Sequence, residues 1–346
     1  MNSESKPGPA GENSRRDFLQ KVGTLAAVSG LASRAIADPQ PKVPTVRFGK
    51  WDVSRLIVGS NTVAGGSHLS TMIDVEMRAW NTPERINQVF KRCEELGINC
   101  MEDGGVRIPK YNAECGGHMM CTTRNTASKD ESLKPGRGAK EIAAKTGCIA
   151  IHHGGAGDTG TDAWWRQGKL DRVREWCKSV RDAGVLVAVT SHRPEVFDII
   201  ESQNWDVDYY MCCLYKYGRT HAEWEKLFEF NPGLAPVDIG HPTEGGSDVY
   251  GGEVAFVRGD PDEMLKVVKQ TKKPCFVYKL LACGRMAQRQ DIVEERFKYI
   301  FSNIKATDAV VVGMWDKHFD VYAINKEYVI KYGGTSIKNG GTATSA

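Results

Sequence analysis

Short apolar runs alternate with amphipathic stretches along most of this chain. A strand covered by helices on both faces is continuously apolar, whereas a strand with one wet face alternates apolar and polar residues. From Arg55 onward the sequence has eight continuous runs, which predict eight buried parallel strands. The runs occupy residues 56–59, 98–101, 119–122, 148–151, 185–189, 207–214, 275–278 and 309–312.

The stretches between the runs carry helix signals. Thr82 is suited to an N-cap, Pro83 to the first turn and Gly97 to a left-handed C-cap, so they delimit a predicted helix. Similar patterns begin at Leu170, Pro194, Asp260 and Val293, where Asp260 is expected to cap its helix. Eight strands alternating with helices predict a single (β/α)8 barrel, and an open doubly wound sheet is the alternative.

Two segments depart from this alternation. Residues 216–260 are too long for a simple connection between the sixth and seventh strands, and we expect them to form a lid or binding loop. Residues 333–346 are rich in Gly, Ser and Thr, which predicts a disordered tail. The barrel domain is therefore expected to span residues 38–332.

The first 37 residues differ in character from the barrel. Arg15 and Arg16 precede an apolar run at residues 22–32, and Ala35-Ile36-Ala37 follows. This order resembles a twin-arginine export signal, which implies recognition by the Tat translocation machinery, cleavage near Asp38 and a periplasmic or extracellular location. The alternative is an uncleaved membrane anchor, but the run is shorter than the roughly 20 residues of a spanning helix. We therefore expect no stable membrane span after cleavage.

Charge and cysteine content narrow the function classes. The export segment has two more basic than acidic residues, so the net charge of +3 falls to +1 on cleavage. A nearly neutral barrel gives no electrostatic reason to expect nucleic acid or an anionic membrane as partner. The 10 cysteines include no CxxC pair and mostly lie in apolar runs, which indicates small buried side chains, with disulfides as the alternative.

Polar residues at the ends of the apolar runs are the candidate site, because barrel enzymes place their active sites at the carboxyl ends of the strands. We expect catalytic roles for Asp103, His153, His192 and Lys279. We expect small-molecule substrate contacts from Glu102, Arg124, His152, Tyr215, Trp315 and, in the lid, His241. Neighbouring residues of a strand face opposite ways, so at most one of His152 and His153 enters the barrel mouth.

These residue types leave two chemistries open. An imidazole beside a carboxylate can act as a general acid or base near neutral pH. Alternatively, Glu102, His153 and His192 form a candidate site for a divalent metal. Lys279, at the end of an apolar run, is either a base or nucleophile with a lowered pKa or the partner of Glu102 or Asp103 across the barrel. Aromatic residues near the strand ends would suit a sugar-like ring.

The chain resembles the aldo/keto reductases over residues 45–330. The likeness rests on Phe48-Gly49-Lys50, on the run from Val53 to Ser60, on Leu96-Gly97-Ile98-Asn99 and on Val312-Gly313 before Ala323-Ile324-Asn325. The resemblance implies a barrel that reduces carbonyls with NADP(H) through an Asp, Tyr, Lys and His tetrad.

Two members of that tetrad have matching residues here. Asp103 matches the aspartate, and His152 or His153 matches the histidine. Ile108 stands at the tyrosine position, Thr123-Arg124 at the lysine position, and Ser191-His192 in place of the Ser-Asn pair that supports the nicotinamide.

Three hypotheses follow from these observations. The first is an exported oxidoreductase on a small polar carbonyl or hydroxyl substrate, either with NADP(H) or with a cofactor that it retains through export. The second is a metal- or lysine-assisted isomerase, lyase or epimerase on a sugar-like substrate. The third is a binding barrel without catalysis.

Overall fold

A computed structural model describes residues 41–130, 132–220, 222–223, 226–227 and 256–334. The export segment, the lid residue His241 and the tail beyond residue 334 lie outside the described residues. The predictions for these parts of the chain remain predictions.

Eight parallel strands close into a barrel in the order β10-β3-β4-β5-β6-β7-β8-β9. Each strand overlaps one of the eight apolar runs, so the predicted (β/α)8, or TIM, barrel is confirmed and the open sheet is wrong. The strands are β3 Leu56–Val58, β4 Cys100–Met101, β5 Met120–Asn125, β6 Ala150–His153, β7 Leu186–Ser191, β8 Tyr209–Cys213, β9 Cys275–Tyr278 and β10 Ala309–Val312.

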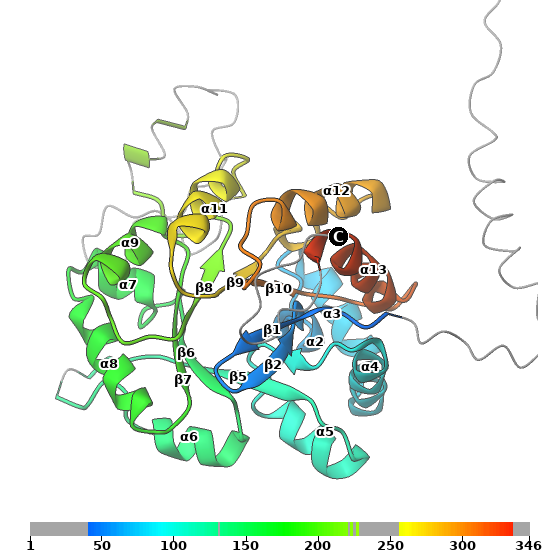
Figure 1. The fold of residues 1–346 in the computed structure, drawn as a ribbon, viewed down its shortest axis with the longest axis horizontal. Coiled ribbons are helices and arrows are strands. Elements are labelled where there is room, and N and C mark those ends of the chain that lie inside the picture. The colour runs from blue at the N-terminus through cyan, green and yellow to red at the C-terminus, as the bar shows by residue number, and fades with distance from the viewer. Residues whose placement is uncertain (1–40, 131, 221, 224–225, 228–255, 335–346) are drawn as a thin grey trace, which may run out of the picture. The chain divides into compact units, whose positions relative to one another are not determined.

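Helices surround the barrel and bury its outer face (Figure 1). They are α2 Ser60–Val63, α3 Thr71–Trp80, α4 Pro83–Leu96, α5 Arg107–Cys115, α6 Ala139–Thr146, α7 Thr161–Arg166, α8 Asp171–Arg181, α9 Pro194–Ser202, α11 Asp260–Gln270, α12 Gln290–Phe301 and α13 Val321–Gly333, with a 3-10 turn η2 at Ala282–Gly284. The boundaries of α4 are as predicted, since Thr82 accepts from the Arg85 amide and Gly97 ends the helix with φ 82°. Asp260 does not cap α11, because the N-cap is Gly259 and the Asp260 carboxylate binds Arg219.

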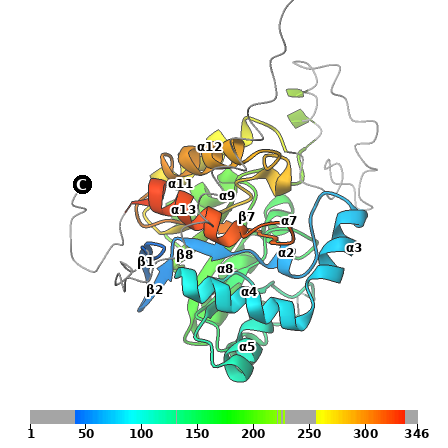
Figure 2. The same cartoon turned by 90° about the vertical axis from the view of Figure 1, so that its right-hand side faces the viewer.

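A hairpin that the apolar runs did not predict closes the amino-terminal end of the barrel. Strands β1 Thr45–Phe48 and β2 Trp51–Ser54 pair antiparallel around a tight turn in which Gly49 has φ 56°. The Phe48 ring packs 4.4 Å from the Tyr209 ring and 4.6 Å from the Phe276 ring, between ring centroids. Figure 2 shows this hairpin at one end of the barrel and α2 with α3 at the other. The carboxyl end is therefore the end left for a site.

Alternation along the strands decides which side chains reach the barrel axis. Tyr209, Met211 and Phe276 belong to the apolar cluster inside the barrel, whereas Tyr210 and Cys212 pack against the helices. Continuing the same alternation toward the carboxyl ends brings a last inward layer to the barrel mouth. That layer contains Glu102, His152, His192, Cys213 and Tyr278.

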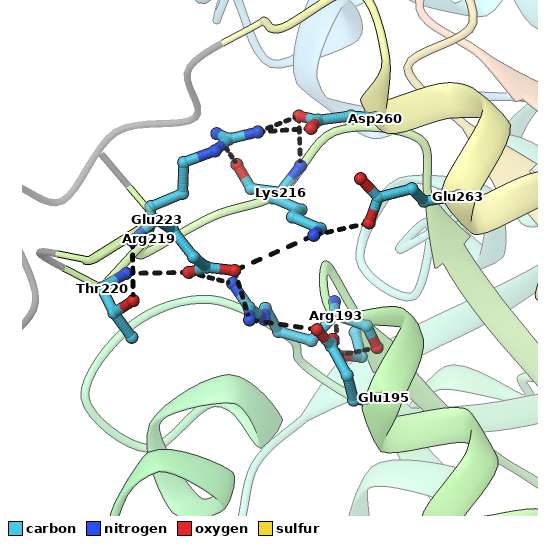
Figure 3. A network of polar contacts seen from close by, with 9 residues as sticks. Arg193, Glu195, Lys216, Arg219, Thr220, Glu223, Asp260 and Glu263 are labelled. Atoms are coloured by element: carbon cyan, nitrogen blue, oxygen red, sulfur yellow. Dashed lines mark hydrogen bonds and ion pairs between the residues drawn. The ribbon is translucent and has the colours of Figure 1, made fainter. Parts of the chain in front are cut away.

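Ion pairs hold the first described part of the long connection after β8 (Figure 3). Arg193, just beyond β7, donates to both oxygens of Glu223 at 3.0 and 2.8 Å. Lys216 lies 2.6 Å from Glu263 of α11, and Arg219 binds Asp260. These ion pairs connect Lys216 and Arg219 to α11, and Glu223 to Arg193 at the start of α9.

All 10 cysteines are unpaired, and eight of them are buried. This agrees with the expectation that most are small core side chains. Within the described residues, no helix is both long and apolar enough to cross a membrane.

Candidate active site

A cavity of about 390 Å³ opens at the carboxyl ends of β3, β4, β9 and β10. Leu69, Met77, Phe319 and Ile324 give much of its wall an apolar surface. The polar groups of its wall include Ser60, Glu102, Tyr278, Lys279 and the backbone around Trp315. A mostly apolar pocket with a few polar groups at its inner end is the usual form of a small-molecule site.

Glu102 follows β4 and is the carboxylate of this cavity. Its Oε2 accepts from the Ser60 hydroxyl at 2.8 Å, and its Oε1 lies 3.6 Å from Nε2 of His152 behind it. Burial, with the neighbouring Asp103 charge, raises the pKa of Glu102. Burial also lowers the pKa of His152 to about 4, so this imidazole is neutral at neutral pH. A carboxylate with a raised pKa is a stronger base than an ordinary one.

Tyr278 ends β9 and lines the same cavity, and its hydroxyl lies next to a buried histidine that is paired with a buried aspartate. The Tyr278 hydroxyl lies 3.3 Å from Nε2 of His192, and Nδ1 of His192 lies 2.7 Å from Oδ2 of Asp162. Burial alone would lower the pKa of His192, but Cys213 and Asp162 outweigh it and raise that pKa to about 9. Burial raises the pKa of Tyr278 well above its usual value. At neutral pH the pair is therefore an imidazolium beneath a protonated phenol.

Two glycines let α7 place Asp162 beside His192. A Cβ at Gly160 would lie 2.3 Å from the Gly155 carbonyl oxygen, so no side chain fits where the loop turns into α7. A Cβ at Gly155 would lie 3.0 Å from Nδ1 of His192. In the His-His-Gly-Gly motif at residues 152–155, His152 thus supplies an inward imidazole, and Gly155 leaves room for the ring of His192 on the next strand.

Three polar atoms inside the barrel have no hydrogen-bond partner among the described residues. They are Nδ1 of His152, the Thr190 hydroxyl and the Tyr209 hydroxyl, which come from the adjacent strands β6, β7 and β8. Buried polar groups are nearly always hydrogen-bonded, to protein, ordered water or ligand. This set suits a polar occupant of the barrel axis.

Lys279 follows Tyr278 and lines the cavity in a left-handed backbone conformation, with φ 64°. Its Nζ lies 6.0 Å from the centroid of the Phe256 ring. The pairing with Glu102 or Asp103 across the barrel is not formed, because Asp103 binds Arg124 and Glu102 accepts from Ser60. Within the described part of the chain, no carboxylate is in ion-pairing distance of Lys279.

Asp103 and Arg124 pair with each other outside the cavity. The Arg124 amide donates to Oδ1 of Asp103 at 2.9 Å, and the Arg124 guanidinium lies 3.5 Å from Oδ2. Tyr215 is buried with its ring 4.9 Å from that of Phe256, while Trp315 does line the cavity. Of the predicted residues, the structure thus brings Glu102, Lys279 and Trp315 to the cavity, with His152 and His192 directly behind it.

His153 faces away from the barrel axis, so the catalytic role expected for it does not fit its position. Its Nε2 accepts from the Ala127 amide at 2.9 Å, and its ring packs 4.9 Å from that of Trp176 in α8. Since His153 points outward, the metal set Glu102, His153 and His192 does not converge. No group of three or more His, Cys, Asp or Glu among the described residues is placed to hold a metal ion.

The cavity also gives little support for the phosphates of NADP(H). Among the described residues its lining has two basic side chains, Lys279 and His68. The N-terminus of α13 borders it, but Asp320 already caps that helix by accepting from the Ala323 amide at 3.0 Å. Phosphates are bound by clustered cations and free helix N-termini. These residues do not fit a dinucleotide, and we derive no step through one.

Three residues of the site were not predicted. Asp162 lies on a helix instead of a strand end, and nothing in its sequence context indicates that position. Tyr278 was assigned to the apolar core of its strand, and Cys213 was counted among the small buried cysteines. The alternation from Tyr209 through Met211 could have placed Cys213 on the inward face.

No family model matches the chain, and no curated protein sequence matches it. Among solved structures, the chain is similar to an aldo-keto reductase from Bacillus halodurans, with 11% identity and TM-score 0.44 over 86% of this chain and 99% of that one. It is also similar to a truncated 3-deoxy-D-arabino-heptulosonate 7-phosphate synthase from Thermotoga maritima, with 13% identity and TM-score 0.43 over 84% and 91% of the chains. An IolI protein with a bound zinc atom matches with 12% identity and TM-score 0.38 over 80% and 98%. None of these three similarities assigns an activity to the chain.

Proposed function

We propose that this barrel is an enzyme that moves protons on a small polar carbonyl or hydroxyl compound of sugar-like character. One observation carries the proposal: Glu102 and Tyr278 line the same cavity, and each has a buried histidine behind it. Paired acid and base groups whose environments differ are the usual arrangement of proton-transfer sites.

Glu102 is the proton acceptor of this pair, and Tyr278 is the proton donor. Glu102 acts as the base, because its raised pKa increases the affinity of the carboxylate for a substrate proton. Tyr278 acts as the acid: it donates to the substrate oxygen and takes a proton from the His192 imidazolium beneath it. Asp162 holds His192 in place and stabilises its charged form. The Lys279 cation favours the negative charge that develops on the substrate oxygen.

The resulting reaction class is isomerisation or epimerisation through an enediol. Glu102 removes a proton from the carbon next to a carbonyl, and Tyr278 protonates the carbonyl oxygen. Return of the proton to the neighbouring carbon, with loss of the proton of the other enediol hydroxyl to the Tyr278–His192 pair, gives the isomer. Return to the opposite face of the first carbon, with the proton of the original carbonyl oxygen going back to Tyr278, gives the epimer. The unpartnered polar atoms of His152, Thr190 and Tyr209 support a substrate with several hydroxyl groups.

Hydrogen exchange tests the proposal across the whole class of substrates at once. The full chain is incubated in D2O with a panel of trioses, aldoses and ketoses, and proton NMR follows exchange at the carbon next to the carbonyl. We expect catalysed exchange for part of the panel and its loss in both Glu102→Gln and Tyr278→Phe. Exchange at the uncatalysed rate across the panel, or full exchange in both variants, would overturn the proposal.

The carbonyl reductase is the second candidate: one observation favours it, although the described lining of the cavity has few cations for the phosphates of a dinucleotide. A tyrosine hydroxyl, a lysine, histidines and a carboxylate meet at this mouth, although not at the family's positions. Titration of the purified protein with NADPH, followed by nucleotide fluorescence, tests it directly. A saturable change would support the reductase, and a flat titration would remove it.

Export by the Tat machinery is likewise proposed, and sequencing the N-terminus of the exported protein tests cleavage near Asp38.

A further inference from the structure

Cys213 occupies the inward layer of the barrel between two residues of the candidate site. Strand register pairs Ser191 with Cys212 and Cys213 with Tyr278, so His192, Cys213 and Tyr278 lie at one level on three adjacent strands. The neighbouring Cys212 points to the other face of the strand, as alternation requires, and interacts with Cys275 instead. This register makes Cys213 the neighbour of His192, whose Nδ1 lies 2.7 Å from Asp162 and whose Nε2 lies 3.3 Å from the Tyr278 hydroxyl.

The charges around this thiol favour its ionised form. Burial raises the pKa of Cys213, but His192 and then Lys279 lower it, and the balance lies below the usual cysteine value. A thiolate, not a thiol, is the nucleophile, and thiolates persist beside a histidine or lysine cation. The titratable groups around Cys213 are His192, Tyr278, Lys279, Tyr215 and Cys283, and Asp162 lies behind His192.

We propose that Cys213 and His192 form a thiolate–imidazolium pair that acts as a nucleophilic site for the carbonyl carbon of a small aldehyde or ketone. The proposal rests on the proposed function for the class of substrate. The thiolate sulfur forms a bond to the carbonyl carbon while the carbonyl π pair moves to the oxygen. That oxygen takes a proton from the His192 imidazolium, directly or through Tyr278. The product is a hemithioacetal, and the reverse step restores the carbonyl compound and the ion pair.

Tyr278 separates Cys213 from the open cavity. Cys213 is fully buried, whereas Tyr278, its register partner, lines the cavity wall. A substrate in the cavity therefore meets Tyr278 first, and the proposed attack requires it to pass beside that side chain. This order suits a site in which the proton donor and the nucleophile act on the two ends of one carbonyl bond.

The dependence of alkylation rate on pH tests the ion pair. The probe is iodoacetamide, and peptide mass spectrometry follows each cysteine of the full chain between pH 6 and 8. Cys283 is the matched control, because it lines the same cavity and burial raises its pKa. We expect a nearly flat profile for Cys213 and a rise of about tenfold per pH unit for Cys283, whose thiolate fraction grows with pH. Equal slopes at the two cysteines would overturn the ion pair.

Ultraviolet absorbance of the thiolate provides a readout that does not depend on access. We expect an acid transition in the wild type that is lost in Cys213→Ser, kept in Cys212→Ser and shifted to higher pH in His192→Gln. The same titration in wild type and Cys213→Ser would overturn the proposal. Circular dichroism checks that each variant is folded, and the comparison of wild type with His192→Gln remains if Cys213→Ser is not.

Carbon-13 NMR with carbonyl-labelled glycolaldehyde tests the covalent step. We expect a hemithioacetal resonance in the wild type and none in Cys213→Ser; its absence from the wild type would overturn the carbonyl chemistry. The two proposals fail separately. Catalysed hydrogen exchange without a thiolate transition would remove only the Cys213 proposal, and a thiolate transition without exchange would remove only the proposed function.

Discussion

Nδ1 of His192 lies 2.7 Å from Oδ2 of Asp162, and both side chains are buried at the barrel mouth. The same carboxylate accepts from the Ser191 hydroxyl at 2.5 Å and from the His192 amide at 3.2 Å. Asp162 therefore fixes the orientation of the imidazole as well as its charge. Much of the expected behaviour of the site depends on this pair.

The pH dependence of hydrogen exchange should be bell-shaped. Glu102 must be ionised, and its raised pKa places the acidic limb above the usual glutamate range. His192 must be protonated, so activity falls as the pH rises through its pKa of about 9. Cys213 and Asp162 both raise this pKa; the Asp162→Asn variant removes the second of the two charges, and its basic limb should move to lower pH. An unchanged basic limb in Asp162→Asn would show that His192 does not supply the proton.

Loss of the Tyr278 hydroxyl should slow the chemical step. We expect Tyr278→Phe to lower kcat by about 10²- to 10⁴-fold, the usual contribution of a general acid, with little change in KM. Tyr210→Phe is the matched control, because that hydroxyl comes from the adjacent strand but bonds Glu201 among the helices. Exchange kinetics of the three proteins check the prediction. Equal losses in both variants would indicate a structural effect.

Gly155→Ala and Gly160→Ala, in the loop before α7, should affect different properties: the first the reaction rate, the second the stability of the fold. Gly160→Ala meets the backbone oxygen of Gly155 and should lower the free energy of unfolding by roughly 1–3 kcal/mol. Gly155→Ala meets the His192 ring instead and should lower kcat with a smaller loss of stability. Urea unfolding and exchange kinetics separate the two effects. Gly157→Ala controls for the loop, although its φ of 86° adds strain of its own.

The sequence predicted the barrel because eight continuously apolar runs alternate with helices; such runs also suit an open doubly wound sheet, and the count of eight favoured the barrel. It predicted Glu102 and His192 because both follow a strand directly. It did not predict Asp162, since the position of a helical residue over the barrel mouth depends on how α7 turns at Gly160. The sequence also assigned the catalytic role to His153, whereas His152 is the histidine that faces the barrel axis. Alternation along a strand requires that one of the two point inward, but it does not say which one.

The outward histidine should make the fold sensitive to acid. Burial lowers the pKa of His153 to about 3, whereas an unfolded histidine titrates near 6.5. Between these values only the unfolded chain binds the proton, so stability falls as the pH falls, by about 1.4 kcal/mol per pH unit for this group. His153→Gln should be less stable than wild type at pH 7, but its free energy of unfolding should decline less steeply from pH 6 to 4. Urea unfolding at several pH values measures both slopes, and His118→Gln, at an exposed position, controls for the loss of a histidine. Parallel slopes for wild type and His153→Gln would mean that His153 takes up its proton in the folded protein.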